Sequence, residues 1–130
     1  EVATEKGAKR AMLLQVSAPF HCAMMAPAAD IMAQALASVD INAPCVPLIA
    51  NVTAAPVEDP AEIRRLLVEQ VTGMVCWRES CLTMRDKGVE TLVEAGAGKV
   101  LSGLAKRIDP DLKGLSVGKP ADIEAFLATL

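Results

Sequence analysis

The chain has 130 residues, of which 52% are hydrophobic and 22% charged, and its net charge is -3. This length supports one stable core, and this composition excludes a disordered chain. No apolar run reaches the ~20 residues of a membrane span, and the start lacks the pattern of a secretory signal peptide. Because the pI is near 5.1 and aromatic residues make up 2% of the chain, neither a membrane nor a nucleic-acid partner is expected.

Apolar periodicity, together with proline and glycine positions, predicts alternating helices and strands. The expected order is a helix end before Gly7, a strand over 11–16, a loop over 17–21, a helix over 22–39, a strand over 46–52, a helix from Pro60 ended by Gly73, a helix over 78–87, a strand over 91–95, a helix over 100–108, a strand over 115–117 and a helix from Pro120. Asp59 is the expected N-cap before Pro60, and Glu62 completes a capping box. This alternation favours an α/β fold with mostly parallel strands.

The four cysteines are Cys22, Cys45, Cys76 and Cys81, and they form no C-x-x-C pair. Neither a zinc ribbon nor a thioredoxin-like centre is therefore expected. Without an export signal, free buried thiols are favoured over two disulfides, and a reducing cytoplasm is the expected location. The chain has one histidine, which excludes a multi-histidine metal site, so we expect no metal.

His21, the single histidine, follows the predicted strand over 11–16 and precedes a predicted helix. Sites in α/β proteins collect at the ends of strands, and an imidazole can act as a general base near neutral pH. A lone histidine is more often structural or merely exposed, and the residues alone leave that interpretation open.

Gln70 falls on the apolar stripe of the helix that starts at Pro60, when the spacing is counted from Ile63. A glutamine that points toward the core needs hydrogen-bond partners, and this helix end could supply an acceptor to an imidazole N–H. The alternative is a glutamine at the edge of the stripe that faces water.

Two glycine motifs resemble known sites without matching them. The turn Gly96-Ala97-Gly98-Lys99 lacks residues that a P-loop and a dinucleotide fingerprint need, although the helix start that follows could still face an anion. Ser116 lies in a G-x-S-x-G match over 114–118, but a nucleophile elbow needs a buried strand and a helix that starts at the serine. A small hydrolase that uses Ser116 with His21 is the weakest interpretation.

Several segments, taken together and in order, resemble malonyl-CoA:acyl-carrier-protein transacylases. The matching segments are 8–11, 16–25, 27–30, 42–44, 46–47, 51–52, 70–71, Trp77 and 96–101. Their order and spacing carry the resemblance, which covers essentially the whole chain. It implies the C-terminal portion of the enzyme, with residues 1–17 as the end of a ferredoxin-like small subdomain. Residues 18–130 would be the C-terminal part of an α/β-hydrolase-like large subdomain.

The resemblance implies transfer of a malonyl group from malonyl-CoA to the phosphopantetheine thiol of an acyl carrier protein, through a serine acyl-enzyme and without a cofactor. His21 matches the family's base, and Gln70 matches the residue whose main-chain carbonyl orients that base. Asn51 matches a residue near the site. Phe20 matches a position where phenylalanine accompanies malonyl selection in related polyketide acyltransferases, because a bulky ring excludes a methyl branch.

The nucleophilic serine, its oxyanion-hole partners and the arginine that pairs with the malonyl carboxylate lie upstream in the family, and no segment here reads G-H-S-x-G. We therefore expect this chain to need a missing N-terminal part and to be inactive without it. Two smaller departures are Ala97, where many members have proline, and residues 74–76 before Trp77. The alternative function is a non-catalytic α/β module that binds an acyl carrier or another partner protein.

Overall fold

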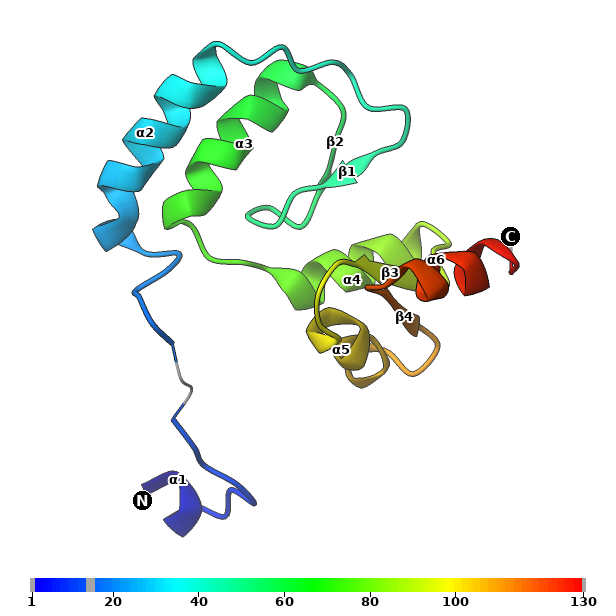
Figure 1. The fold of residues 1–130 in the computed structure, drawn as a ribbon. Helices are drawn as coiled ribbons and strands as arrows, with labels where there is room; N and C mark the ends of the chain where they lie inside the picture. The colour runs from blue at the N-terminus through cyan, green and yellow to red at the C-terminus, as the bar shows by residue number, and fades with distance from the viewer. Residues whose placement is uncertain (1, 14–15, 130) are drawn as a thin grey trace.

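The computed structural model describes residues 2–13 and 16–129, and Figure 1 shows its arrangement. The helices are α1 (Val2–Glu5), the 3-10 helix η1 (Ala23–Met25), α2 (Ala26–Ala37), α3 (Pro60–Thr72), α4 (Trp77–Asp86), α5 (Val100–Ile108) and α6 (Pro120–Leu127). The strands are β1 (Leu48–Ile49), β2 (Pro56–Val57), β3 (Thr91–Ala95) and β4 (Lys113–Val117). An α/β fold is confirmed, and the predicted helices over 22–39, 78–87 and 100–108 are present within one to four residues of their expected bounds.

Helices α2 and α3 lie side by side and form the main packed pair in the N-terminal half of the described chain (Figure 1). The Asp59 side chain accepts a hydrogen bond of 2.8 Å from the Glu62 backbone N–H, which confirms the predicted N-cap. The carboxylate of Glu62 does not complete the capping box and instead pairs with Arg65 at 2.7 Å. Just beyond the C-terminal end of α2, the Val39 carbonyl accepts a hydrogen bond of 2.8 Å from the Arg64 side chain on α3, which connects the two helices.

The strand predicted over 46–52 is shorter than expected. Only Leu48 and Ile49 form β1, which pairs antiparallel with β2. A turn then takes over the backbone, because the Ala54 N–H donates to the Ala50 carbonyl at 2.8 Å and Ala54 has a positive φ of 53°. The described strands thus form two separate two-stranded sheets, and the prediction of mostly parallel strands holds for only one of them: β1 and β2 are antiparallel, whereas β3 and β4 are parallel.

Strands β3 and β4 pair in register from Thr91 with Lys113 to Ala95 with Val117, and α5 connects them. Gly114 lets α5 approach this sheet, because a Cβ atom at that position would lie 2.1 Å from the Ser102 carbonyl oxygen. Beneath the sheet, Cys81, Ala105 and Leu112 form a small buried cluster. This second group of elements packs separately from the α2–α3 pair (Figure 1).

The strand predicted over 11–16 is not present in its described part. Residues 11–13 and 16 have no strand hydrogen bonding, and Leu13 is 95% exposed. The remaining residues of that prediction, 14–15, lie outside the described residues. A strand needs a neighbour to bond its backbone groups, and no described segment pairs with this one. The proposed boundary between subdomains at residue 17 stays a prediction.

Asp109 is a buried carboxylate that links α4 to the connection between α5 and β4. It accepts from the Asp111 backbone N–H at 2.9 Å and forms an ion pair with Arg85 on α4. The Asp111 N–H, followed by the Arg85 guanidinium, holds the pKa of Asp109 below its ordinary value. Since these contacts favour the charged form, the folded protein is stabilised while Asp109 is ionised.

We predict that Asp109→Asn lowers the free energy of unfolding at neutral pH, as measured by urea unfolding. The difference from the unchanged protein should shrink as the pH falls below the ordinary aspartate pKa of about 4. A carboxylate whose folded pKa is lowered contributes stability above its unfolded pKa and loses it on protonation. Asp111→Asn is the matched control, because its backbone rather than its side chain makes the contact. Equal stability of the Asp109→Asn and unchanged proteins at every pH would contradict this role.

Candidate functional site

His21 lies in the turn between Pro19 and the 3-10 helix η1. Its backbone has a φ of 56°, in the left-handed region that residues other than glycine rarely adopt. The side chain is exposed. Backbone in such a region persists only where the surrounding structure holds it, and it clusters at functional sites. The left-handed backbone of His21 therefore identifies this turn as a candidate functional site.

The His21 ring binds the end of α3. Its Nδ1 atom lies 2.9 Å from the Gln70 carbonyl oxygen. This carbonyl belongs to the last turn of α3, where backbone oxygens have no partner within the helix. Because a carbonyl oxygen can only accept, Nδ1 donates the hydrogen, and in the neutral ring Nε2 is then the unprotonated nitrogen. The contact between His21 and the Gln70 carbonyl that the family resemblance implies is present, and it leaves Nε2 as the nitrogen without a hydrogen.

A cavity of about 300 Å³ lies beside this contact. His21 and Gln70 border it, together with Phe20 and apolar side chains of η1, α2 and α3, including Met25, Met32 and Leu67. Phe20 is 57% exposed, so its ring is free to contact a ligand held there. The cavity can hold a small acyl group next to the imidazole.

Asn51 does not share that cavity. It borders a second cavity of about 300 Å³, together with Gln70 and residues of β1 and α3. The Asn51 carbonyl accepts from the Cys76 N–H at 2.7 Å, which fixes the chain between β1 and α4. The structure thus groups Phe20, His21 and Gln70 around one cavity, and it places Asn51 on the far side of Gln70.

Sequence reasoning missed Glu94 at the end of β3. Its carboxylate accepts from the Ser102 backbone N–H at 2.9 Å and from the Ser102 hydroxyl at 2.8 Å. These hydrogen bonds, with the Ser102 backbone N–H first, lower the pKa of Glu94. The first turn of α5, which seemed free to face an anion, is therefore already occupied by a carboxylate of the chain itself. The signal in the sequence was an acidic residue two positions before Gly96, at the end of a predicted strand.

Ser116 does not occupy a nucleophile elbow. It lies within β4, where it pairs in register with Glu94, and α6 starts only at Pro120. An elbow serine has to sit on the turn from strand to helix. The structure therefore gives no support to a hydrolase that uses Ser116.

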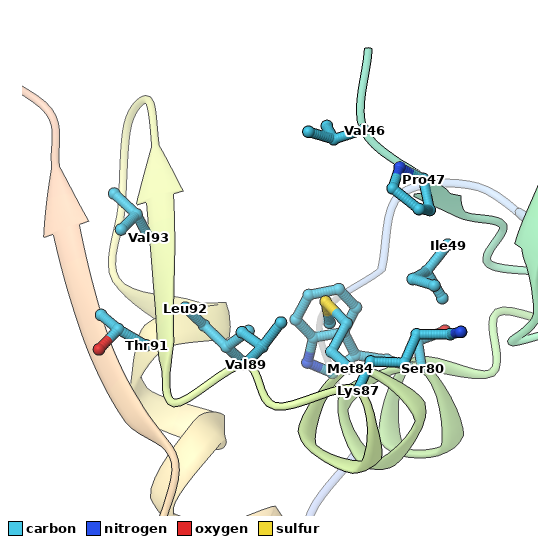
Figure 2. Close-up of a pocket in the computed structure, with 11 residues that line it drawn as sticks. Val46, Pro47, Ile49, Ser80, Met84, Lys87, Val89, Thr91, Leu92 and Val93 are labelled. Carbon is cyan, nitrogen blue, oxygen red and sulfur yellow. The ribbon is translucent and has the colours of Figure 1, made fainter. Parts of the chain in front are cut away.

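Another cavity, of about 690 Å³, lies between the β1 segment and β3 (Figure 2). Its walls are mostly apolar, with Val46 and Pro47 on one side and Leu92 and Val93 on the other. None of the predicted site residues borders it. Strand β3 bonds to β4 along its other edge, so this cavity follows an unpaired edge of a sheet. We place the site at His21, where the polar groups converge, and not here.

Within the described residues there is no group of three or more histidine, cysteine, aspartate or glutamate side chains that could hold a metal ion. No helix among them is long and apolar enough to cross a membrane. All four cysteines are free, as predicted, but only Cys81 is buried, and Cys45 is exposed.

Comparison with known proteins identifies relatives across the whole chain, although no family model matches it. The malonyl CoA-acyl carrier protein transacylase of Bacillus subtilis is 43% identical over 130 residues, which is 100% of this chain and 41% of the relative. The same-named protein of Escherichia coli K12 is 46% identical over 121 residues, which is 93% of this chain and 39% of the relative. The chain thus spans about two fifths of the length of the curated relatives it matches.

Solved structures give the same result. The acyl-carrier-protein-S-malonyltransferase of Bartonella henselae is 57% identical with a TM-score of 0.87, covering 98% of this chain and 41% of that one. A malonyl-transacylase solved in complex with its type II PKS acyl-carrier protein is 38% identical with a TM-score of 0.86, covering 98% of this chain and 41% of that one. The resemblance inferred from the sequence is thereby confirmed, and over its whole length the chain is homologous to part of the malonyl CoA-acyl carrier protein transacylases.

Proposed function

We propose that this chain supplies the histidine-bearing part of an acyltransferase that moves a malonyl group from malonyl-CoA to the phosphopantetheine thiol of an acyl carrier protein. The contact between His21 Nδ1 and the Gln70 carbonyl, 2.9 Å long, carries the proposal, because it prepares an imidazole to accept protons at Nε2. The names of the relatives support malonyl-CoA as donor, and the solved complex supports a carrier protein as acceptor.

In this mechanism, His21 Nε2 takes the proton of a serine hydroxyl as the serine oxygen attacks the malonyl thioester. The resulting imidazolium returns that proton to the departing CoA thiolate. In the second half, Nε2 takes the proton of the incoming carrier thiol, which attacks the acyl-enzyme, and the serine oxygen recovers the proton. The Gln70 carbonyl holds the ring by Nδ1 throughout. No cofactor is required.

The serine belongs to the part of the relatives that this chain does not cover. Two observations support a role within a longer protein: the exposed His21 ring, and the apolar cavity along the unpaired edge of β3 (Figure 2). We propose that the remaining part completes this sheet as the large α/β-hydrolase-like subdomain, preceded here by the end of a ferredoxin-like subdomain at residues 1–17. With four free thiols, the protein belongs in a reducing cytoplasm.

A non-catalytic module that binds an acyl carrier is the competing function. Such a module has no need of a left-handed histidine whose ring is fixed by a helix-end carbonyl. The two functions differ in one measurable property, which is whether His21 affects acyl transfer or only carrier binding.

We predict that His21→Ala in the complete enzyme, meaning this chain together with the remaining part, slows malonyl transfer by about 10²- to 10⁴-fold, the usual contribution of a general base. Transfer of labelled malonyl from malonyl-CoA to the carrier protein measures this effect. His21→Gln, which keeps a polar side chain but cannot take up a proton, should be equally slow. Carrier binding should be unchanged in both variants. Near-native transfer by both would favour the non-catalytic module.

We predict that Phe20→Ser in the complete enzyme raises use of methylmalonyl-CoA relative to malonyl-CoA by about tenfold, within the range that one methyl group contributes in an apolar pocket. The exposed ring borders the cavity beside His21, so its removal opens space for the branch. The ratio of the two kcat/KM values is the measurement. Phe20→Leu keeps most of the bulk and should keep the selectivity. An unchanged ratio in Phe20→Ser would remove Phe20 from substrate selection.

A further inference from the structure

The side chain of Cys22 closes the turn that carries His21. The Cys22 thiol lies 3.1 Å from the Pro19 carbonyl oxygen and donates to it. Cys22 stands at the N-cap of η1, yet its side chain makes no hydrogen bond to that helix. The thiol instead reaches back across Phe20 and His21, so that the hydrogen bond encloses both residues.

The backbone of Cys22 is held from the other direction. Its carbonyl accepts from the Met25 N–H at 2.9 Å, which is the first hydrogen bond of η1. The start of the turn is held too, because the Phe20 N–H donates to the Ala18 carbonyl at 3.0 Å. Cys22 therefore connects the helix start to Pro19, and the left-handed His21 is the residue between them.

We propose that Cys22 is a positioning residue for His21, and this proposal rests on the proposed function. The hydrogen bond from its thiol to Pro19 keeps His21 in the left-handed conformation. That backbone conformation presents the ring to the Gln70 carbonyl, 2.9 Å from Nδ1. Without the thiol, the backbone of His21 is free to relax to an ordinary conformation, and the ring then loses its fixed distance to Gln70.

A hydroxyl can replace the thiol in this role, whereas a methyl group cannot, because serine also carries a donor one bond beyond Cβ. Cys22→Ser should therefore preserve the turn and Cys22→Ala should release it. Cys45→Ala is the matched control, since Cys45 is also a free cysteine but is exposed and outside the site.

The first test reads the ring directly. This chain has one histidine, and in the complete enzyme labelled with ¹⁵N-histidine the ring signals of His21 are identified as the ones that His21→Gln removes. In the complete enzyme and in its Cys22→Ser and Cys45→Ala variants, we expect the pattern of a ring protonated at Nδ1. In Cys22→Ala we expect averaging between the two tautomers, because the Gln70 carbonyl no longer selects one of them. This measurement does not depend on acyl transfer, so it tests the proposal even if the proposed function fails.

The second test is kinetic. Cys22→Ala should lower kcat for malonyl transfer by about fivefold, which corresponds to ~1 kcal/mol of the barrier, with KM for malonyl-CoA unchanged. Cys22→Ser should recover kcat to within about twofold. An unchanged ring signature in Cys22→Ala overturns the proposal, as does equal impairment of the Ala and Ser variants. Loss of the fold in Cys22→Ala also overturns it, because a residue that acts through His21 is not needed for folding.

Discussion

The candidate site depends on one unpaired backbone oxygen at the end of a helix. Helix α3 ends at Thr72, so the Gln70 carbonyl has no partner along the chain and is available to His21 Nδ1 at 2.9 Å. This carbonyl therefore selects the ring tautomer in which Nδ1 carries the hydrogen. The identity of the side chain at position 70 is secondary to where its backbone lies.

Strand β3 is hydrogen-bonded to β4 along one edge, and among the described residues no strand pairs with its other edge. Glu94 closes the first turn of α5 through Ser102, and Gly114 allows α5 to approach β4 closely. The opposite edge of β3 borders an apolar cavity of about 690 Å³. A parallel sheet is normally covered on both faces and paired along its strands, so this open edge is consistent with a chain that covers 41% of its relatives.

Local signals in the sequence predicted the elements that local chemistry determines. Asp59 and Pro60 gave the start of α3 because capping needs only nearby residues. The strand predicted over 46–52 was wrong in extent, because apolar composition does not reveal where a turn begins, and the backbone bonds at Ala50 and Ala54 end it early. The contact between His21 and Gln70 joins residues 49 positions apart. Periodicity alone does not predict a contact over this separation, whereas the family resemblance implied it. The role of Glu94 was missed because its partner, Ser102, comes close to it only when the Gly96–Gly98 turn reverses the chain.

The packing of α3 fixes the orientation of the helix about its own axis, and this orientation sets the position of the Gln70 carbonyl at the site. Ile63 and Leu66 are buried, so the apolar face of the helix fixes the side of the helix on which each backbone carbonyl lies. Successive residues of an α-helix are rotated by about 100°, since one turn takes 3.6 residues. If α3 were rotated to bury the neighbouring residues instead, the Gln70 carbonyl would move by this angle around the helix, out of reach of His21 Nδ1. The packing of Ile63 and Leu66 at one end of α3 is therefore also a constraint on the tautomer of the imidazole at the other end.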